Sequence, residues 1–152
     1  MTPRIENPDD LPDKYAEQIP DDVRVAEASE HTVIEVPVRT PNLNDIINAS
    51  KTHWSEYKRM KDDIDEQVEV ACAIADAPKY NSCHLKITYI REHRQEDPDN
   101  ICAGKKFLID GLVSYGVLPD DGWKHIKSFK EFWKVGDEPK VIIKIIGRAN
   151  ND

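Results

Sequence analysis

Two groups of acidic residues in the second half of the chain could bind a metal ion. Asp97 and Asp99 flank Pro98 and precede Asn100, and a second pair lies in the run Pro119-Asp120-Asp121-Gly122. Each run also has an ordinary structural explanation, because Asp99 could cap a following helix and Pro-Asp-Asp-Gly is typical of a turn. Taken alone, each run is more often structural than functional.

The residues after Asn100 predict a helix that ends near Tyr115, with Gly116 as the residue that terminates it. A helix turns by about 100° per residue. This step places four residues on one stripe of the helix surface: Asp99, Ala103, Lys106 and Asp110. Lys106 and Asp110 have helical i,i+4 spacing, so the carboxylate could orient the ammonium group, although such pairs are usually weak. The stripe therefore combines two carboxylates with a lysine.

If the two acidic runs met in the fold, their carboxylates would repel one another unless a cation neutralised them. Ligand sets made only of oxygen atoms favour Mg²⁺ or Mn²⁺ over Zn²⁺. A magnesium ion that keeps water molecules can activate one of them and stabilise the charge that develops during phosphodiester hydrolysis. A nearby lysine would add a positive group at the same phosphate. The sequence does not show whether Asp120 or Asp121 reaches Asp97 and Asp99.

The stretch from Asp97 to Ile126 resembles the RusA family of Holliday junction resolvases, in particular its phage and prophage branch. The shared features are an Asp-x-Asp-Asn run, a lysine in the following helix, a helix end at Gly116-Val117 and the Asp120-Asp121 pair. A weaker likeness reaches upstream to Pro41-Asn42-Leu43-Asn44, and the resemblance spans residues 32–147. The chain departs from the shorter bacterial members in one respect, because its lysine follows the acidic pair about one helical turn later.

The resemblance implies a homodimeric, Mg²⁺-dependent endonuclease that makes paired symmetric cuts in four-way DNA junctions during phage or prophage DNA recombination or repair. Mn²⁺ is a possible substitute metal, and the expected location is the cytoplasm of a bacterial host cell. By the same comparison, Asp97, Asp99 and Asp121 would be the catalytic, metal-binding acids and Lys106 the catalytic lysine. Lys105 is the second choice for the lysine because it lies off the stripe.

A junction resolvase also needs basic side chains near its metal site to hold the DNA backbone. Arg91 and Arg94 precede the acidic pair, and a lysine-rich stretch from Lys124 to Lys134 follows it with only Glu131 opposing. Each run alone is more often a solvated face, but their position on both sides of the acidic residues favours DNA contact. The predicted DNA-binding residues are Arg91, Arg94, Lys105, Lys124, Lys127 and Lys130.

A small set of elements must position these residues. Besides the helix at 100–115, the patterns predict a strand at Thr32–Val38, a long amphipathic helix at Ser50–Ala75 and strands at Cys83–Ile90 and Lys140–Ile146. Pro37 lacks an amide hydrogen, so the first strand should lie at an edge of the sheet. The segment Trp123–Val135 fits either a helix or a strand. This order indicates an α+β domain at 32–152, with a mixed β-sheet packed with two α-helices.

The length of the chain indicates one domain, and its negative charge is concentrated at the N-terminal end. The chain has 152 residues and a net charge of -8, which by itself argues weakly against nucleic-acid binding. Residues 1–31 carry nine acids and three bases, so this proline-containing segment, which we expect to be a partly disordered acidic arm, accounts for most of that charge. No stretch has the run of about 20 apolar residues that a membrane span needs, so neither a membrane nor a secreted protein is expected. The three cysteines lack disulfide or zinc spacing.

Two other functions remain compatible with the sequence. The chain could be a non-catalytic protein that binds branched DNA on the same fold. It could instead be a small acidic interaction protein whose arm binds a protein partner. The arm itself could pack on a partner, or it could shield a basic surface until DNA arrives.

Overall fold

A computed structural model of the chain describes residues 31–150, with side chains for residues 31–147. Apart from His31, the predicted acidic arm at 1–31 lies outside the described residues. His31 itself is the first residue of a strand.

The described residues form a four-stranded mixed sheet, as the sequence predicts. Its strands are β1 (His31–Val36), β2 (Lys79–Arg91), β3 (Ile126–Val135) and β4 (Lys140–Asn150). Their order across the sheet is β1-β4-β2-β3. Strand β4 is antiparallel to both of its neighbours, whereas β2 and β3 run parallel. The α+β class with a mixed sheet is therefore confirmed, and β1 is an edge strand.

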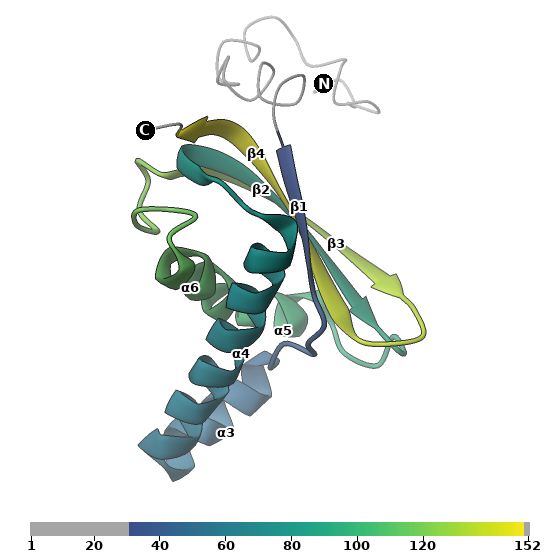
Figure 1. Cartoon of the computed structure of the whole chain (residues 1–152). Coiled ribbons are helices and arrows are strands. Elements are labelled where there is room, and N and C mark those ends of the chain that lie inside the picture. The colour runs from purple at the N-terminus through teal and green to yellow at the C-terminus, as the bar shows by residue number, and fades with distance from the viewer. Residues whose placement is uncertain (1–30, 151–152) are drawn as a thin grey trace, which may run out of the picture.

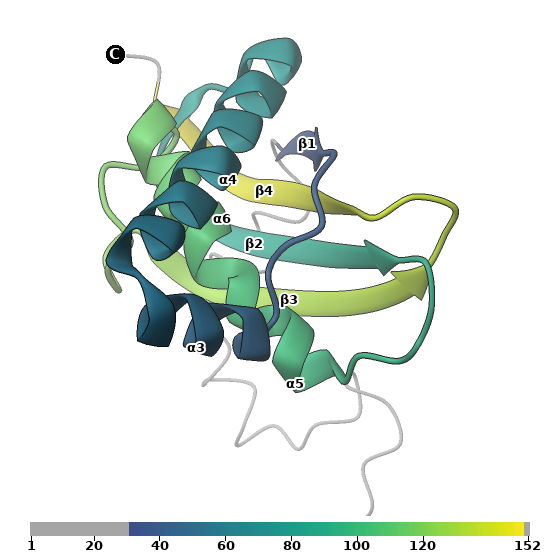
Figure 2. The ribbon, with the colours of Figure 1, turned by 90° about the horizontal axis from the view of Figure 1, so that it is seen from below.

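All helices of the described residues cover one face of this sheet (Figures 1 and 2). They are α3 (Leu43–Thr52), α4 (Trp54–Ala75), α5 (Pro98–Ile101) and α6 (Lys105–Tyr115), with a 3₁₀ turn, η2 (Cys102–Gly104), between the last two. The prediction of two continuous helices is wrong, because each of them is interrupted. None of the helices in this part of the chain is long and apolar enough to span a membrane.

The first interruption lies at His53, whose backbone is extended between α3 and α4. The predicted helix also begins too late, because Asn42 caps α3 and starts it at Leu43. The Asn42 side chain accepts a hydrogen bond from the Asp45 amide, and the Asp45 carboxylate accepts one from the Asn42 amide. This reciprocal pair is a capping box, which satisfies amide groups that a helix end leaves free.

The second interruption separates Asp99 from α6. A Cβ atom on Gly104 would lie 2.8 Å from both the Pro41 carbonyl oxygen and Thr40 Cβ, so only glycine lets this turn approach the link before α3. Because residues 102–104 wind as a 3₁₀ helix, the constant 100° step that placed Asp99 on the stripe of Lys106 and Asp110 does not hold.

The core lies between the helices and the sheet. Strand residues Ile34, Leu85, Ile87, Ile143 and Ile145 are buried there against Ile64 and Val68 of α4 and Phe107 and Leu112 of α6. Segment 123–135, which the sequence left open, contains the strand β3, and Phe129 and Trp133 remain about two-fifths exposed at this edge of the sheet. The chain passes from β2 through α5 and α6 to β3, the helical crossover that parallel strands require.

Candidate functional site

The acidic pair lies at the start of α5. Asp97 is the N-cap residue and Pro98 occupies the first turn, yet the Asp97 side chain makes no capping hydrogen bond. Its backbone carbonyl accepts from the amides of Asn100 and Ile101 at 3.0 and 3.1 Å. Asp99 Oδ1 accepts from the Asn100 amide at 3.0 Å. Both carboxylates are exposed, so the capping function that the sequence allowed for Asp99 is only partly used, and oxygen atoms remain available to a ligand.

Asp97 borders a hollow of about 520 Å³ between the ends of β2 and β3 and the start of α5. Its polar lining consists of Arg91, His93, Arg94, Glu96, Asp97 and Lys134. Tyr89 and Trp133, whose rings stack with centroids 6.2 Å apart, form an apolar wall. Carboxylate and cationic side chains therefore share one concave surface, which suits a ligand that has an anionic group and binds a metal ion.

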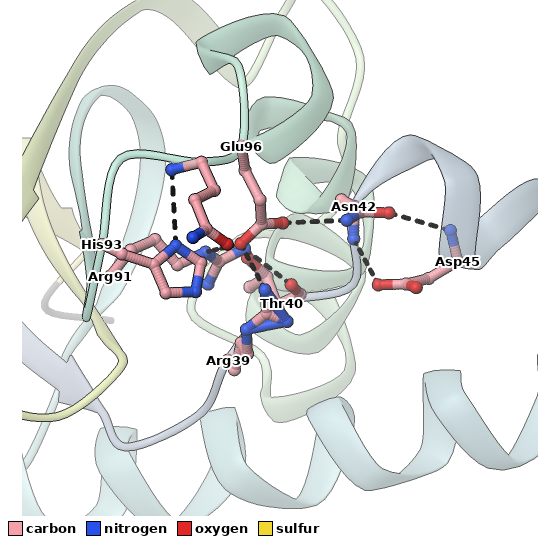
Figure 3. Close-up of polar contacts among 8 residues, drawn as sticks. Arg39, Thr40, Asn42, Asp45, Arg91, His93 and Glu96 are labelled. Carbon is pink, nitrogen blue, oxygen red and sulfur yellow. Dashed lines mark hydrogen bonds and ion pairs between the residues drawn. The ribbon is translucent and has the colours of Figure 1, made fainter.

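Arg91 is 3% exposed and connects this hollow to the link before α3 (Figure 3). Its Nη2 donates to the carbonyl oxygen and to the hydroxyl of Thr40, at 2.7 and 3.2 Å. Its Nε lies 3.3 Å from Glu96 Oε1, while Nη1 has no hydrogen-bond partner among the residues described. Arg91, predicted as a DNA contact, is thus buried and held mainly by internal contacts.

Glu96 collects several of these contacts. Its carboxylate accepts from Asn42 Nδ2 at 2.8 Å and pairs with Arg39 as well as with Arg91. Burial raises the pKa of Glu96, but the hydrogen bond from Asn42 and the charges of Arg91 and Arg39 outweigh it and hold this pKa below its ordinary value. Glu96 therefore remains ionised and ties the acidic loop to the start of α3.

The two candidate lysines have different surroundings. Lys106 is 66% exposed, and its Nζ lies 3.6 Å from Asp110 Oδ2, the pair that the spacing predicted. Lys105 Nζ lies 2.8 Å from Glu131 Oε1 and 4.4 Å from the centre of the Phe129 ring. Glu131 also accepts from the Tyr89 hydroxyl at 2.8 Å, and burial together with this carboxylate raises the pKa of Tyr89. Lys105 is thus partly buried and paired with Glu131, and Lys106 is the more available ammonium group.

Asp121 does not join the acidic pair within one chain. Its loop follows α6 and lies beside the start of β2, where the Tyr80 amide donates to the Val117 carbonyl and the Cys83 amide to the His125 carbonyl. Asp97 lies instead beyond the other end of β2, past Arg91. Within residues 31–147, no three His, Cys, Asp or Glu side chains lie close enough together to hold a metal ion.

The predicted DNA-binding lysines do not form one cluster. Lys124 lies in the loop before β3, and Lys127 lies where the register between β3 and β2 shifts, between Ile126 and Ser128. Lys130 and Lys134 lie on the sheet face away from the helices, and Lys134 also lines the hollow. Arg94 is exposed at the rim of the hollow.

Sequence reasoning missed Thr40, Asn42, Glu96, Tyr89 and Glu131. A local pattern was available for Asn42, because Asn42-x-x-Asp45 is a helix-start motif. The other contacts join residues far apart in the chain, and no local pattern marks them.

Comparison with known proteins adds no identification. No protein-family model matches the chain, and no curated protein matches it. The likeness to the RusA family therefore rests on the residues themselves.

Proposed function

We propose that the chain is a Mg²⁺-dependent endonuclease that hydrolyses phosphodiester bonds in four-way DNA junctions and acts as a homodimer in phage or prophage recombination or repair. The observation that carries this proposal is the shared hollow at α5. There Asp97, from the acidic motif, lies with Arg94, which the sequence assigned to DNA, and with Lys134. A metal-binding carboxylate and phosphate-binding cations are needed together for phosphodiester hydrolysis.

The acidic pair fits the expected metal. Mg²⁺ usually takes one or two carboxylates and completes its shell with waters and substrate phosphates. Asp97 and Asp99 supply two exposed carboxylates on either side of Pro98 at the start of α5, with no nitrogen or sulfur ligand required. When bound there, the ion would activate a water molecule and stabilise charge on the phosphate.

Lys106 is the lysine that this proposal assigns to the substrate phosphate. Its ammonium group is exposed and only loosely paired with Asp110, whereas the Lys105 ammonium is engaged by Glu131. Arg94 and Lys134 would contact the DNA backbone at the rim of the hollow, and Arg91 would hold the acidic loop in position.

Asp121 takes part in this proposal only if a second copy of the chain supplies it. Two identical active sites related by a two-fold axis match the two equivalent strands that a resolvase cuts. The separation of Asp121 from Asp97 along β2 makes the shared arrangement the one in which all three acids can meet.

The first experiment measures cleavage of a synthetic four-way junction and of a linear duplex, with and without Mg²⁺. We expect paired symmetric nicks in the junction only. Asp99→Asn should reduce the rate at least about a hundredfold, whereas Asp63→Asn, which changes an exposed acid on α4, should leave it unchanged. Cleavage that survives Asp99→Asn would exclude the acidic pair as the metal site.

A second experiment tests the shared site. Asp99→Asn and Asp121→Asn chains, each inactive as a homodimer, are mixed, refolded together and assayed for nicking. If the sites are shared, one of the two in the mixed dimer has all its acids, and nicking returns. If each site uses one chain only, both sites in the mixed dimer lack an acid, and nicking stays absent.

The alternative function is a branched-DNA-binding protein that does not cut. The observation that favours it is the absence of any three-residue metal-binding group among residues 31–147. Tight binding of the junction, with no nicks at any Mg²⁺ or Mn²⁺ concentration, would establish this alternative.

A further inference from the structure

Among residues 31–150, one face of the sheet carries no helix, and this face has a row of three lysines across neighbouring strands. Lys144 on β4 lies directly opposite Lys86 on β2, and Lys86 lies directly opposite Lys130 on β3. Val33 on the edge strand β1 completes the row. The neighbours Leu85 and Ile145 point into the core, so alternation places the three lysines, which we call the lysine row, on the other face. Figures 1 and 2 show all helices on the opposite side.

The described part of this face offers little negative charge to the lysine row. Like charges directly opposite each other destabilise a sheet. Within residues 31–147, neither Lys86 nor Lys144 forms an ion pair, and Lys86 Nζ instead lies 5.4 Å from the centre of the Phe132 ring. Strand β1 contributes one acid, Glu35, and its Oε1 forms an ion pair with Lys140 Nζ at 2.7 Å. Lys86 and Lys144 therefore offer positive charge that suits an acidic ligand.

A hollow adjoins the lysine row. It measures about 200 Å³ and is lined by His84, Lys86, Ser128, Lys130 and Ile146, among others. An extended acidic peptide could place a side chain in such a hollow while its carboxylates contact the lysines. The face is also continuous with the candidate site, because Lys134 lies on the same side of β3 as Lys130 and lines the hollow at α5.

The chain itself contains a segment of matching charge next to this face. Residues 1–30 hold nine acids and three bases, and Glu27 and Glu30 are among the last four residues before β1. The segment joins the sheet at His31, whose partner on β4 is Ile146, a residue of the hollow. Adjacent strands lie about 4.8 Å apart, so the three steps from β1 to β3 need only about five extended residues.

We propose that the acidic segment 1–30 binds the lysine row of its own chain, with the 200 Å³ hollow as its anchoring point. A consequence, which rests on the proposed function, is that the segment competes with the DNA backbone for this face. The segment would then lower DNA affinity until a phosphate backbone of higher charge density displaces it.

Zero-length carbodiimide cross-linking of the full chain, followed by peptide mass spectrometry, tests the docking without DNA. We expect amide cross-links between the lysine row and acids of residues 1–30. The close pairs Lys105–Glu131 and Lys140–Glu35 serve as internal positive controls. If these controls cross-link and the lysine row does not link to the segment, the proposal is wrong.

A second cross-linking experiment, on an equal mixture of ¹⁵N-labelled and unlabelled chains, shows whether the segment docks on its own chain. Links of mixed isotope composition would mean docking on a second copy and would also overturn the proposal.

The competition is tested with two full-length variants that each lose five negative charges. The first neutralises acids of the segment: Glu17→Gln, Asp21→Asn, Asp22→Asn, Glu27→Gln and Glu30→Gln. The matched control neutralises five exposed acids of α4: Glu56→Gln, Asp62→Asn, Asp63→Asn, Glu66→Gln and Glu69→Gln. We expect the first variant to bind a DNA duplex about tenfold more tightly than the control, and to lose this advantage when Lys86, Lys130 and Lys144 are changed to Gln.

Equal affinities in the two charge variants would exclude competition at the lysine row. If no form of the protein binds DNA, the proposed nuclease function fails. The cross-linking result then still decides whether the segment docks, so the two proposals fail separately.

Discussion

Glu96 joins the acidic loop to the segment before α3, and its ionisation makes that junction sensitive to pH. Its folded-state pKa lies below the ordinary value of 4.5, so it stabilises the fold above that pH and loses this contribution as the pH falls through the folded-state pKa. We expect Glu96→Gln to lower the free energy of unfolding by about 1.5–3 kcal/mol at pH 7, and by progressively less below pH 4.5. Urea unfolding across this range measures the difference. The exposed Glu92→Gln is the control, and a pH-independent loss would contradict the interpretation.

The cysteines give a second prediction at the scale of single residues. Burial raises the pKa of the Cys72 thiol to about 11 and that of Cys83 to about 12, whereas Cys102 is only partly buried. Because the thiolate is the reactive form, iodoacetamide at pH 8 should add one group to the folded chain, at Cys102, and three in urea. Intact-mass and peptide analysis check this, and comparable labelling of Cys83 in the folded chain would show that β2 opens.

The residues that the sequence could predict are those whose partners are local. The Lys106–Asp110 pair and the exposed Asp97 and Asp99 follow from helical spacing and from a helix-start pattern. The Glu96–Arg39 and Lys105–Glu131 pairs do not, because their members are 57 and 26 positions apart and no periodicity connects them.

At the scale of elements, the crossing of α4 and α6 depends on Gly111. A Cβ atom there would lie 2.8 Å from Val68 Cβ, so Gly111→Ala must push the helices apart. Alanine favours a helix over glycine by about 1 kcal/mol, but overpacking of a core costs about 1–3 kcal/mol. We therefore expect a net loss of stability and a lower melting temperature.

The exposed Ser114→Ala in the same helix is the control for helix propensity. Adding Val68→Ala removes the two γ-methyl groups that would each lie 3.0 Å from the new methyl group, so the double variant should lose less stability than the sum of the two single changes. A stabilised Gly111→Ala variant would show that α4 and α6 do not approach this closely.

The sequence predicts the type of most elements better than the residues at which they begin and end. The strands β1, β2 and β4 follow from alternation, the long amphipathic stretch of α4 from helical period, and the mixed sheet from the order of the elements. The pattern of β3 fits a helix as well as a strand. The breaks at His53 and at residues 102–104 depend on where α3 and the link at Thr40 and Pro41 pack, and periodicity carries no information on that packing.

At the scale of the whole molecule, the sequence does not show whether Asp97, Asp99 and Asp121 lie close together in the fold. Helix α6 spans 11 residues between them and places the Asp121 loop beside the start of β2. Local spacing indicates which residues share a helix face, but not which end of the sheet a loop reaches. The proposed enzyme therefore depends on how two copies associate, which is why the mixed-dimer experiment is more informative than further single substitutions.

Metal binding by the folded chain should appear as a change in global stability. A ligand that binds only the folded state stabilises it by mass action, so 10 mM Mg²⁺ acting on a site with a dissociation constant of about 1 mM would add about 1.4 kcal/mol. For a folded region of this size, that raises the melting temperature by about 3–7 °C. Asp99→Asn should abolish the shift and Asp63→Asn should keep it, because only the first removes a carboxylate at α5. Differential scanning calorimetry with Mg²⁺ and with Na⁺ at equal ionic strength measures this. The same shift in the Asp99→Asn variant, or none in the unmodified chain up to 50-fold higher Mg²⁺ than that assumed constant, would place metal binding elsewhere or exclude it.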